Sequence, residues 1–183
     1  MCRIPNTIVA TVGNGYIINR TRPAPGRGGK NDMDNAANRR RLKDEVFLRM
    51  ATELSRLGTC CRLKVGCVLL RTDGGIASGG YNGALPGMPH CTPETCNPDQ
   101  RCLHTSHAEE NALGFCFGPI QTVYVTDEPC LTCTRALIRR GAKRVVFLRP
   151  YTSIAQQERD EREAMIKFFG VAWERFEGTW EIG

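Results

Sequence analysis

Histidine and aromatic residues are scarce in this chain. Only 3 of its 183 residues are histidines, and Phe, Trp and Tyr together make up 7%. The basic N-terminal third in particular has few rings on which unpaired nucleotide bases could stack. One of the three histidines, His107, lies in "SHAEENAL" (106–113), with a glutamate two positions later.

Long apolar stretches are absent as well. No run reaches the roughly 18 apolar residues that mark a membrane-spanning helix, and "MCRIPNTIVATVGNGYIINR" (1–20) lacks the charged, apolar and small-residue order of a secretory signal. We therefore expect a cytoplasmic protein with no membrane partner. No internal repeat is visible, and the 41% hydrophobic content suits a single domain with its own core.

Cysteine, in contrast, is abundant, with 10 residues. In a short secreted protein this number would indicate disulfides, but this chain is longer and most of its cysteines fall in short-spaced clusters, some beside histidines. Metal binding is therefore the favoured interpretation.

Basic residues are in excess, and the net charge is +6. They concentrate in "NRRRLK" (38–43) and "RALIRRGAKR" (135–144). Two interpretations are open: a solvated surface, or attraction for a phosphorylated substrate or a nucleic acid.

The first residues differ in character from the rest of the chain. Two β-rich runs around Asn-Gly predict a hairpin over residues 7–19. Residues 20–36 are rich in Pro, Gly and charge without periodicity, which predicts a linker. We therefore assign residues 1–39 to an N-terminal hairpin and a mobile basic linker, and residues 40–183 to the compact domain.

Hydrophobic periodicity predicts the elements of this domain. A helix is expected over 42–57, stopped by Gly58, and a β-hairpin follows around the turn "TDGG" (72–75). Residues 83–105, rich in Gly, Pro and Cys, predict a long loop that needs a staple. Helices and strands then alternate over 107–116, 122–128, 130–141, 144–150, 155–170 and 171–178. This order predicts an α/β fold with helices packed on a mixed sheet.

Three residues have the chemistry of a catalytic zinc site. His107, Cys130 and Cys133 supply one nitrogen and two sulfur ligands, which leaves the fourth position of a tetrahedral ion for water. The C-x-x-C spacing at a helix start lets both thiolates reach one ion. Glu109 can face the water and move its proton without being a ligand. The alternative is a closed structural zinc knot, but Glu109 and the adjacent Pro129 favour catalysis.

The pattern H-x-E…P-C-x-x-C is the established signature of zinc-dependent nucleobase deaminases. From about residue 42 to 176 the chain resembles the deoxycytidylate (dCMP) deaminase family of bacterial and bacteriophage type. The blocks that carry the resemblance are "GTCCRLKVGCVLL", "GGYNGALPGMPHC", "RCLHTSHAEENAL", "VYVTDEPCLTC" and "ALIRRGAKRVVF". It implies hydrolytic deamination of dCMP, or of a 5-substituted dCMP, to the uracil nucleotide. It also implies a three-layer α/β/α cytidine-deaminase-like sandwich with a central mixed sheet, and a homo-oligomer such as a hexamer.

The resemblance also implies substrate contacts. Asn82 is expected near the sugar and ring, while the amide of Ala108 and the carbonyl of Pro129 are expected to recognise the pyrimidine edge. Tyr124 either covers the base or is buried in the core.

The segment "GFCFGPIQ" (114–121) is shorter than the corresponding link in the family, whose extension ordinarily carries residues near the nucleotide phosphate. Any phosphate must then be bound by other cations, and the candidates are Arg101, Arg135 and the arginines of the N-terminal segment.

A second, structural zinc is implied as well. Its expected ligands are Cys60, Cys91, Cys96 and Cys102, with His90 as the alternate; otherwise these are free buried thiols. The segment "GGYNGALPG" (79–87) resembles the place where regulated members bind dCTP and dTTP as effectors, although turn formation alone explains its glycines.

Other functions were weighed against nucleotide deamination. A deaminase of tRNA or single-stranded DNA would use the basic N-terminal third, but that stretch has few aromatics. A zinc-stabilised nucleic-acid-binding module would have no use for Glu109. A deaminase of another cytosine nucleoside or aminopyrimidine is a further alternative.

Overall fold

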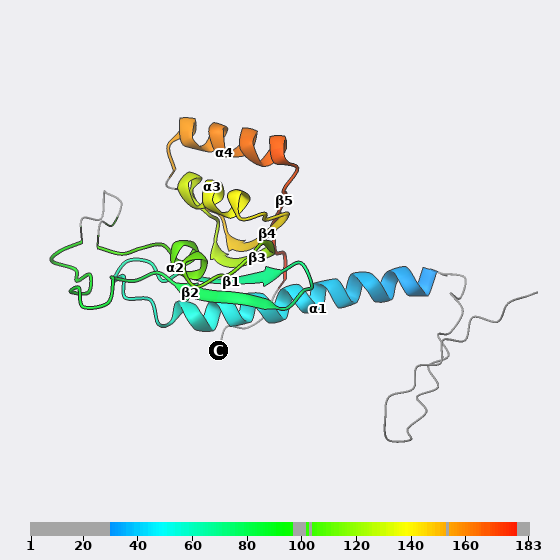
Figure 1. Ribbon diagram of the computed structural model, residues 1–183, viewed down its shortest axis with the longest axis horizontal. Helices are drawn as coiled ribbons and strands as arrows, with labels where there is room; N and C mark the ends of the chain where they lie inside the picture. The colour runs from blue at the N-terminus through cyan, green and yellow to red at the C-terminus, as the bar shows by residue number, and fades with distance from the viewer. Residues whose placement is uncertain (1–29, 97–101, 103, 153, 179–183) are drawn as a thin grey trace, which may run out of the picture. The chain divides into compact units, whose positions relative to one another are not determined.

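The computed structural model describes residues 30–96, 102, 104–152 and 154–178 (Figure 1). The hairpin predicted over residues 7–19 lies outside these ranges. Contacts between residues divide the chain into one unit of Met1–Arg39 and a second of Arg40–Gly183. The second unit contains the sheet and all of the predicted metal ligands.

Helix α1 covers Lys30–Ser55, so it begins well before residue 42. The prediction of an irregular linker over 20–36 is therefore wrong for residues 30–36. The side chains of residues 35–42 are all exposed, so this part of the helix has no apolar stripe to reveal it. The stretch 30–42 also contains neither glycine nor proline, the two residues that most disfavour a helix, so it can be helical without an amphipathic pattern.

Five strands form one mixed sheet in the order β2-β1-β3-β4-β5. Strand β1 is antiparallel to β2 and β3, whereas β3, β4 and β5 run parallel. The strands are β1 (Gly66–Arg71), β2 (Ile76–Tyr81), β3 (Ile120–Asp127), β4 (Arg144–Arg149) and β5 (Ala172–Arg175). The remaining helices are α2 (Ala108–Gly114), α3 (Leu131–Arg139) and α4 (Gln156–Phe169). The predicted order of helices and strands is confirmed.

Both faces of the three central strands, β1, β3 and β4, are largely buried, and their side chains alternate between two cores. On β3, Val123 and Val125 face the core that contains residues of α2 and α3, whereas Tyr124 faces the core under α1. In Figure 1, α1 runs along one side of the sheet and α3 and α4 lie on the other. The fold is therefore the predicted three-layer α/β/α sandwich.

Helix α2 approaches the sheet closely at a glycine. A Cβ atom at Gly80 of β2 would lie 2.5 Å from the backbone nitrogen of Ala112 and 2.6 Å from the carbonyl oxygen of Ala108. Only glycine leaves room for this approach. Gly80 thereby sets the distance between α2 and the sheet. Helix α2 follows His107 and carries Glu109.

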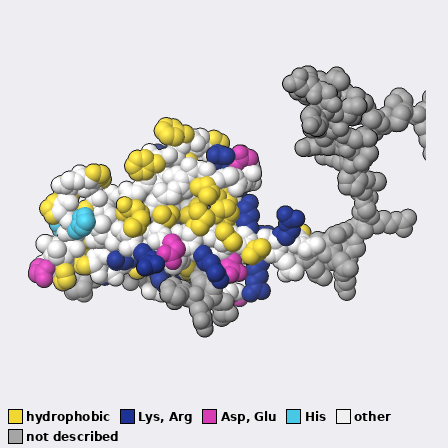
Figure 2. Space-filling view, turned by 90° about the horizontal axis from the view of Figure 1, so that it is seen from below, with side chains coloured by type: hydrophobic (Ala, Val, Ile, Leu, Met, Phe, Trp, Pro, Cys, Tyr) yellow, Lys and Arg dark blue, Asp and Glu magenta, His cyan; other side chains and the backbone are white. Residues whose placement is uncertain are grey.

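Charges of both signs are interspersed on the α1 side of the molecule. Figure 2, which views it from below the orientation of Figure 1, shows Lys and Arg side chains alternating with Asp and Glu. Three arginines there pair with carboxylates: Arg40 with Glu174, Arg49 with Glu45, and Arg56 with Glu53. Of these three, Arg40 belongs to the basic stretch 38–43, and its pairing with Glu174 favours the solvated-surface interpretation at that position. None of the described helices is both long and apolar enough to cross a membrane.

Candidate active site and thiol cluster

One histidine and two cysteines meet just beyond the carboxyl end of β3. Nδ1 of His107 lies 3.5 Å from Sγ of Cys130 and 3.3 Å from Sγ of Cys133. With ordinary bond lengths and tetrahedral angles, zinc holds a nitrogen and a sulfur ligand about 3.5 Å apart. The structure thus brings together the three ligands predicted from the sequence, and their spacing fits one zinc ion bound through Nδ1.

Helix starts fix the positions of these ligands. His107 immediately precedes α2, and its backbone N–H donates to Oε2 of Glu110 at 2.8 Å. Cys130 immediately precedes α3, and its carbonyl accepts hydrogen bonds from the backbone N–H and the hydroxyl of Thr134, both at 2.9 Å. Because these bonds close the first turn of each helix, they orient the side chains that project from it.

The two cysteines differ in their tendency to ionise. The pKa of Cys130 is lowered to about 3. The hydrogen bond with Cys133 is the largest cause, and His107 contributes to the same lowering. The same hydrogen bond, followed by burial, raises the pKa of Cys133. Cys130 therefore ionises readily, whereas ionisation of Cys133 needs the positive charge of a bound cation.

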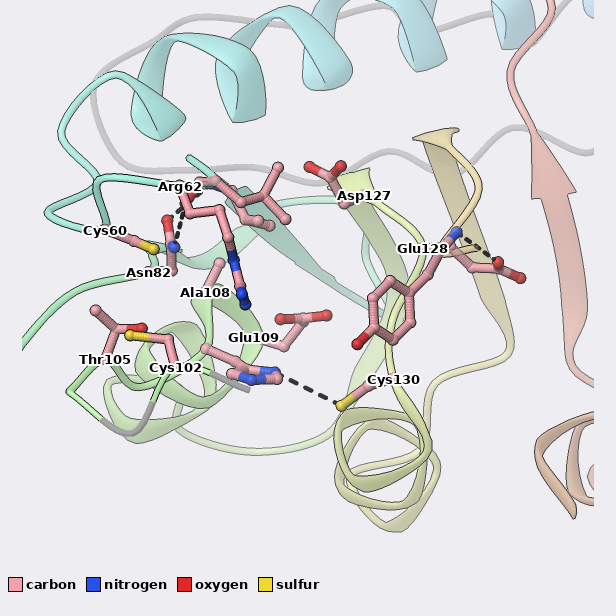
Figure 3. Close-up of a pocket in the computed structure, with 14 residues that line it drawn as sticks. Cys60, Arg62, Asn82, Cys102, Thr105, Ala108, Glu109, Asp127, Glu128 and Cys130 are labelled. Atoms are coloured by element: carbon pink, nitrogen blue, oxygen red, sulfur yellow. Dashed lines mark hydrogen bonds between the residues drawn. The ribbon is translucent and has the colours of Figure 1, made fainter. Parts of the chain in front are cut away.

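Glu109 lies beside the three ligands in the first turn of α2. The residue is 4% exposed, and burial raises the pKa of its carboxyl to about 7. A carboxyl with a pKa near neutrality can both accept and donate a proton at neutral pH. Figure 3 shows the carboxyl group directed into a pocket.

This pocket is partly open to solvent. The space among its lining residues, including the open part, is about 700 Å³. His107, Glu109 and Cys130 form one part of its wall, and Arg62 and Asn82 contribute another (Figure 3). The pocket therefore places a buried acid–base group and a zinc-ligand set against one cavity.

The family profile described as the cytidine and deoxycytidylate deaminase zinc-binding region matches residues 41–149. The chain belongs to this deaminase family. It is 37% identical over 115 residues to ComE operon protein 2 of Bacillus subtilis, covering 59% of this chain and 60% of that protein. It is 32% identical over 149 residues to the deoxycytidylate deaminase of Saccharomyces cerevisiae, covering 75% of this chain and 46% of that protein. The chain thus spans less than two thirds of the length of both relatives.

Phage members of the family are also similar. The deoxycytidylate deaminase of Mycobacterium phage D29 is 36% identical over 124 residues, covering 57% of this chain and 92% of that protein. The crystal structure of dCMP deaminase from the cyanophage S-TIM5 in complex with dCMP and dUMP superposes with a TM-score of 0.57 at 25% identity. That match covers 72% of this chain and 95% of the cyanophage chain.

Two of the predicted substrate contacts line the pocket. Asn82 has both ends of its amide engaged: Oδ1 accepts from the N–H of Val65 and Nδ2 donates to the carbonyl of Leu63, each at 2.7 Å. Asn82 therefore shapes this part of the wall by holding the loop that precedes β1. Ala108 is the first residue of α2, where a backbone N–H has no partner within the helix and is free to meet a ligand.

The carbonyl of Pro129 has a protein partner instead. Arg162 of α4 donates from Nη1 to this oxygen at 3.1 Å, and its Nη2 lies 2.9 Å from Oε1 of Glu128. Glu128 and Cys130 line the pocket on either side of Pro129, which does not. Sequence reasoning missed Arg162, because its partners lie more than 30 residues away. A carbonyl oxygen has two lone pairs, so a substrate contact at Pro129 would share it with Arg162.

Tyr124 is a core residue. The structure therefore contradicts its prediction as a substrate contact and agrees with the alternative that it is buried in the core. It is 1% exposed and packs against Phe47 of α1 with ring centroids 5.2 Å apart. Its hydroxyl donates to Oδ1 of Asp44 at 2.7 Å, and Arg144 pairs with the same carboxylate. The reason is the alternation of β3, which directs residue 124 to the face opposite the pocket.

Of the predicted phosphate-binding cations, Arg135 does not lie at the pocket. It belongs to α3, is exposed, lies 3.8 Å from Glu161, and is not part of the pocket wall. Arg101 and the arginines before residue 30 lie outside the described residues. Arg62, from the loop between α1 and β1, lines the pocket and points into it (Figure 3). The segment "CCRLKVG" offered no periodic signal that would have singled it out.

Five further cysteines form two overlapping groups, not the predicted set of four. Cys60, Cys91 and Cys102 make up the first group; Cys61, Cys91 and Cys96 make up the second, with sulfur atoms within 4.8 Å of one another in each. The prediction that Cys96 joins Cys60 and Cys102 is therefore wrong in this structure, because its thiol lies with that of Cys61.

Cys61 was missed, although the adjacent pair "CC" in the sequence was a visible signal for it. His90, the predicted alternate ligand, is exposed and belongs to neither group.

Proposed function

We propose that this chain is a zinc-dependent deoxycytidylate deaminase, which hydrolyses dCMP to dUMP and ammonia. The observation that carries the proposal is the burial of Glu109 in a pocket beside His107, Cys130 and Cys133. The deaminases of yeast and phage D29, and the cyanophage enzyme with dCMP and dUMP, support this choice of substrate.

The chain's own residues supply the proton transfers. Zinc in the His107, Cys130 and Cys133 site would provide the Lewis acidity that makes a water nucleophilic at neutral pH. Glu109 accepts one proton of the attacking water and passes it to the ring nitrogen; it then takes the second proton, from the hydroxyl added to the ring, and delivers it to the amine, which leaves as ammonia while the carbonyl forms. Its raised pKa of about 7 suits a group that must hold and release a proton in one cycle.

Recognition of the base uses the pocket wall. The N–H of Ala108 is placed at the start of α2 to donate to the pyrimidine edge, and the carbonyl of Pro129 is the corresponding acceptor. Asn82 has two roles. Its hydrogen bonds to residues 63 and 65 hold the pocket wall, and the remaining N–H of its amide donates to the sugar and ring region of the substrate.

Arg62 is the proposed contact for the 5′-phosphate. It is a guanidinium on the pocket wall opposite Cys130 (Figure 3), and arginine binds phosphate with paired, charge-assisted hydrogen bonds. One such contact is worth roughly 1.5–3 kcal/mol. We therefore expect dCMP, or a 5-substituted dCMP, to be preferred over deoxycytidine by at least about tenfold in kcat/KM.

A deamination panel tests the function. Ammonia release is measured with cytosine, deoxycytidine, dCMP, dCTP, 5-substituted dCMP and a cytosine-containing oligonucleotide. Preference for a monophosphate supports the proposal. Equal kcat/KM for deoxycytidine and dCMP would replace it with a nucleoside or free-base deaminase on the same zinc site, and preference for the oligonucleotide would replace it with a polynucleotide deaminase.

Arg62→Ala tests the phosphate contact separately. We expect the KM for dCMP to rise about tenfold or more, while deoxycytidine turnover changes little. Arg56→Ala is the matched control, because Arg56 is exposed and paired with Glu53. An equal loss on both substrates would show that Arg62 does not bind the phosphate.

Finer features complete the proposal. A structural zinc is held by Cys60, Cys91 and Cys102, and the protein acts in the cytoplasm, where its nine described cysteines, all free, stay reduced. It forms a homo-oligomer, for which Phe115 and Phe117, 76% and 91% exposed, offer apolar contact surface. Sedimentation measures the oligomer, and addition of dCTP or dTTP to the assay tests the predicted effectors.

A further inference from the structure

Five thiols from distant parts of the chain are gathered on one side of the pocket. Two come from the loop after α1, Cys60 and Cys61, and three from the long loop before α2, Cys91, Cys96 and Cys102. Sγ of Cys91 lies 3.5 Å from Sγ of Cys61 and 3.8 Å from Sγ of Cys102. Two thiolates on one tetrahedral zinc ion lie about 3.8 Å apart, so both contacts have the spacing of shared metal ligands.

The arrangement of the thiols is that of two sites with one common ligand. Cys60 and Cys61 are neighbours in sequence, yet their sulfur atoms belong to different groups. A single ion at either group leaves two of the five sulfur atoms outside its reach. Cys91 is the one member of both groups, and it is buried, at the place where a bridging ligand would lie.

Charge does not oppose a second ion. Zinc binds the thiolate form of cysteine, so filling a site releases protons, and thiols outside the reach of an ion stay protonated near neutral pH. One Zn²⁺ ion on three thiolates has a net charge of about −1, and two ions on five thiolates also have a net charge of about −1.

We propose that Cys61, Cys91 and Cys96 hold a zinc ion of their own, and that the thiolate of Cys91 bridges it to the ion in the group of Cys60, Cys91 and Cys102. This dinuclear centre is separate from the His107 site. It ties the loop after α1 to the long loop before α2, and thereby supplies the staple that a loop of this length requires. Cys60 and Cys102 also line the substrate pocket (Figure 3), so the centre fixes one wall of that pocket.

Metal content tests the proposal without reference to activity. Protein purified under reducing conditions and dialysed against a weak chelator is expected to hold three zinc ions per chain, and His107→Ala two. In the His107→Ala background, Cys61→Ser or Cys96→Ser should lower the count to one, and Cys91→Ser should remove both ions. Cys116→Ser is the matched control, because Cys116 is buried but belongs to neither group; its count should stay at two.

Cadmium substitution tests the bridge itself. With ¹¹³Cd in the His107→Ala protein, two resonances are expected, with scalar coupling between the two metal ions through the sulfur of Cys91. Uncoupled resonances would overturn the bridge. A count of one zinc ion in the His107→Ala protein would overturn the dinuclear centre, whether Cys61→Ser leaves that ion in place or removes it. The zinc count of the His107→Ala protein alone decides whether the dinuclear centre exists. Misfolding of a cysteine variant therefore leaves the proposal testable.

Discussion

Replacement of Arg162 by methionine should destabilise the protein severely, although Arg162 is not a metal ligand. The residue is 2% exposed. Its guanidinium pairs with Glu128 at 2.9 Å, and the two side chains are 3% and 9% exposed. It also donates to the carbonyl of Pro129 at 3.1 Å. One side chain from α4 thus holds the loop that leads into Cys130.

The expected cost follows from the partner that is left behind. Removing one member of a buried ion pair typically costs about 3–5 kcal/mol, because the other charge stays buried without compensation. Glu128 would keep hydrogen bonds from Nε1 of Trp173 at 2.9 Å and from the backbone N–H of Tyr151 at 3.0 Å, which places Arg162→Met toward the lower end of that range. The carbonyl of Pro129 would also lose its donor.

Urea unfolding at saturating zinc measures the effect. Arg135→Met is the control, since Arg135 is 53% exposed and lies 3.8 Å from Glu161; it should cost less than about 1 kcal/mol. Adding Glu128→Gln to Arg162→Met should recover part of the loss, because the uncompensated charge is then removed. A cost below about 1 kcal/mol for Arg162→Met, similar to the control, would refute the reasoning.

Three further perturbations address the acid–base group, the packing of α2 and the dependence on pH. Glu109→Gln should keep the fold and the zinc but lower kcat by roughly 10²–10⁴-fold; more than about a tenth of wild-type turnover would remove Glu109 from the mechanism. Gly80→Ala should cost roughly 1–3 kcal/mol and lower zinc occupancy, because its Cβ would meet the backbone of α2 at 2.5 Å, whereas Gly114→Ala, with open space around it, should be neutral in the same thermal and metal assays. Arg144 holds the pKa of Glu174 below its usual 4.5, so Glu174 stabilises the fold at neutral pH and this contribution is lost as the pH falls through its lowered pKa. Denaturation curves should therefore show a smaller loss of stability below about pH 4.5 for Glu174→Gln than for the wild type, and parallel losses would contradict the assignment.

The grouping of the predicted zinc ligands with Glu109 could be anticipated from the sequence because the geometry is local. His107 and Glu109 are two residues apart at one helix start, and Cys130 and Cys133 are three apart at another, so helix geometry alone fixes most of their relative positions. The central strands were equally accessible, since both of their faces are largely buried and their apolar runs are short and bounded by turns.

Features that depend on distant partners were not accessible. Tyr124 was left undecided between pocket and core, and the decision came from Asp44, which lies 80 residues earlier. The grouping of Cys96 with Cys61 depends on the course of a long irregular loop, for which the sequence has no periodic signal. Arg62 follows two cysteines in a connecting loop, and nothing local distinguishes it from the exposed arginines of α1.

Reactivity and specificity consequently reside in different kinds of structure. The acid–base group and the zinc ligands stand at the starts of two helices, and residues outside the reaction hold these helices in place: Gly80 through close packing and Arg162 through the loop before Cys130. Arg62 and the thiols of Cys60 and Cys102 reach the same pocket from loops. Loops vary more readily than the elements that they connect, so the loop wall of the pocket can change while the groups at the two helix starts stay the same. The proposed dinuclear centre would reduce this freedom, because it fixes two of those loops to each other.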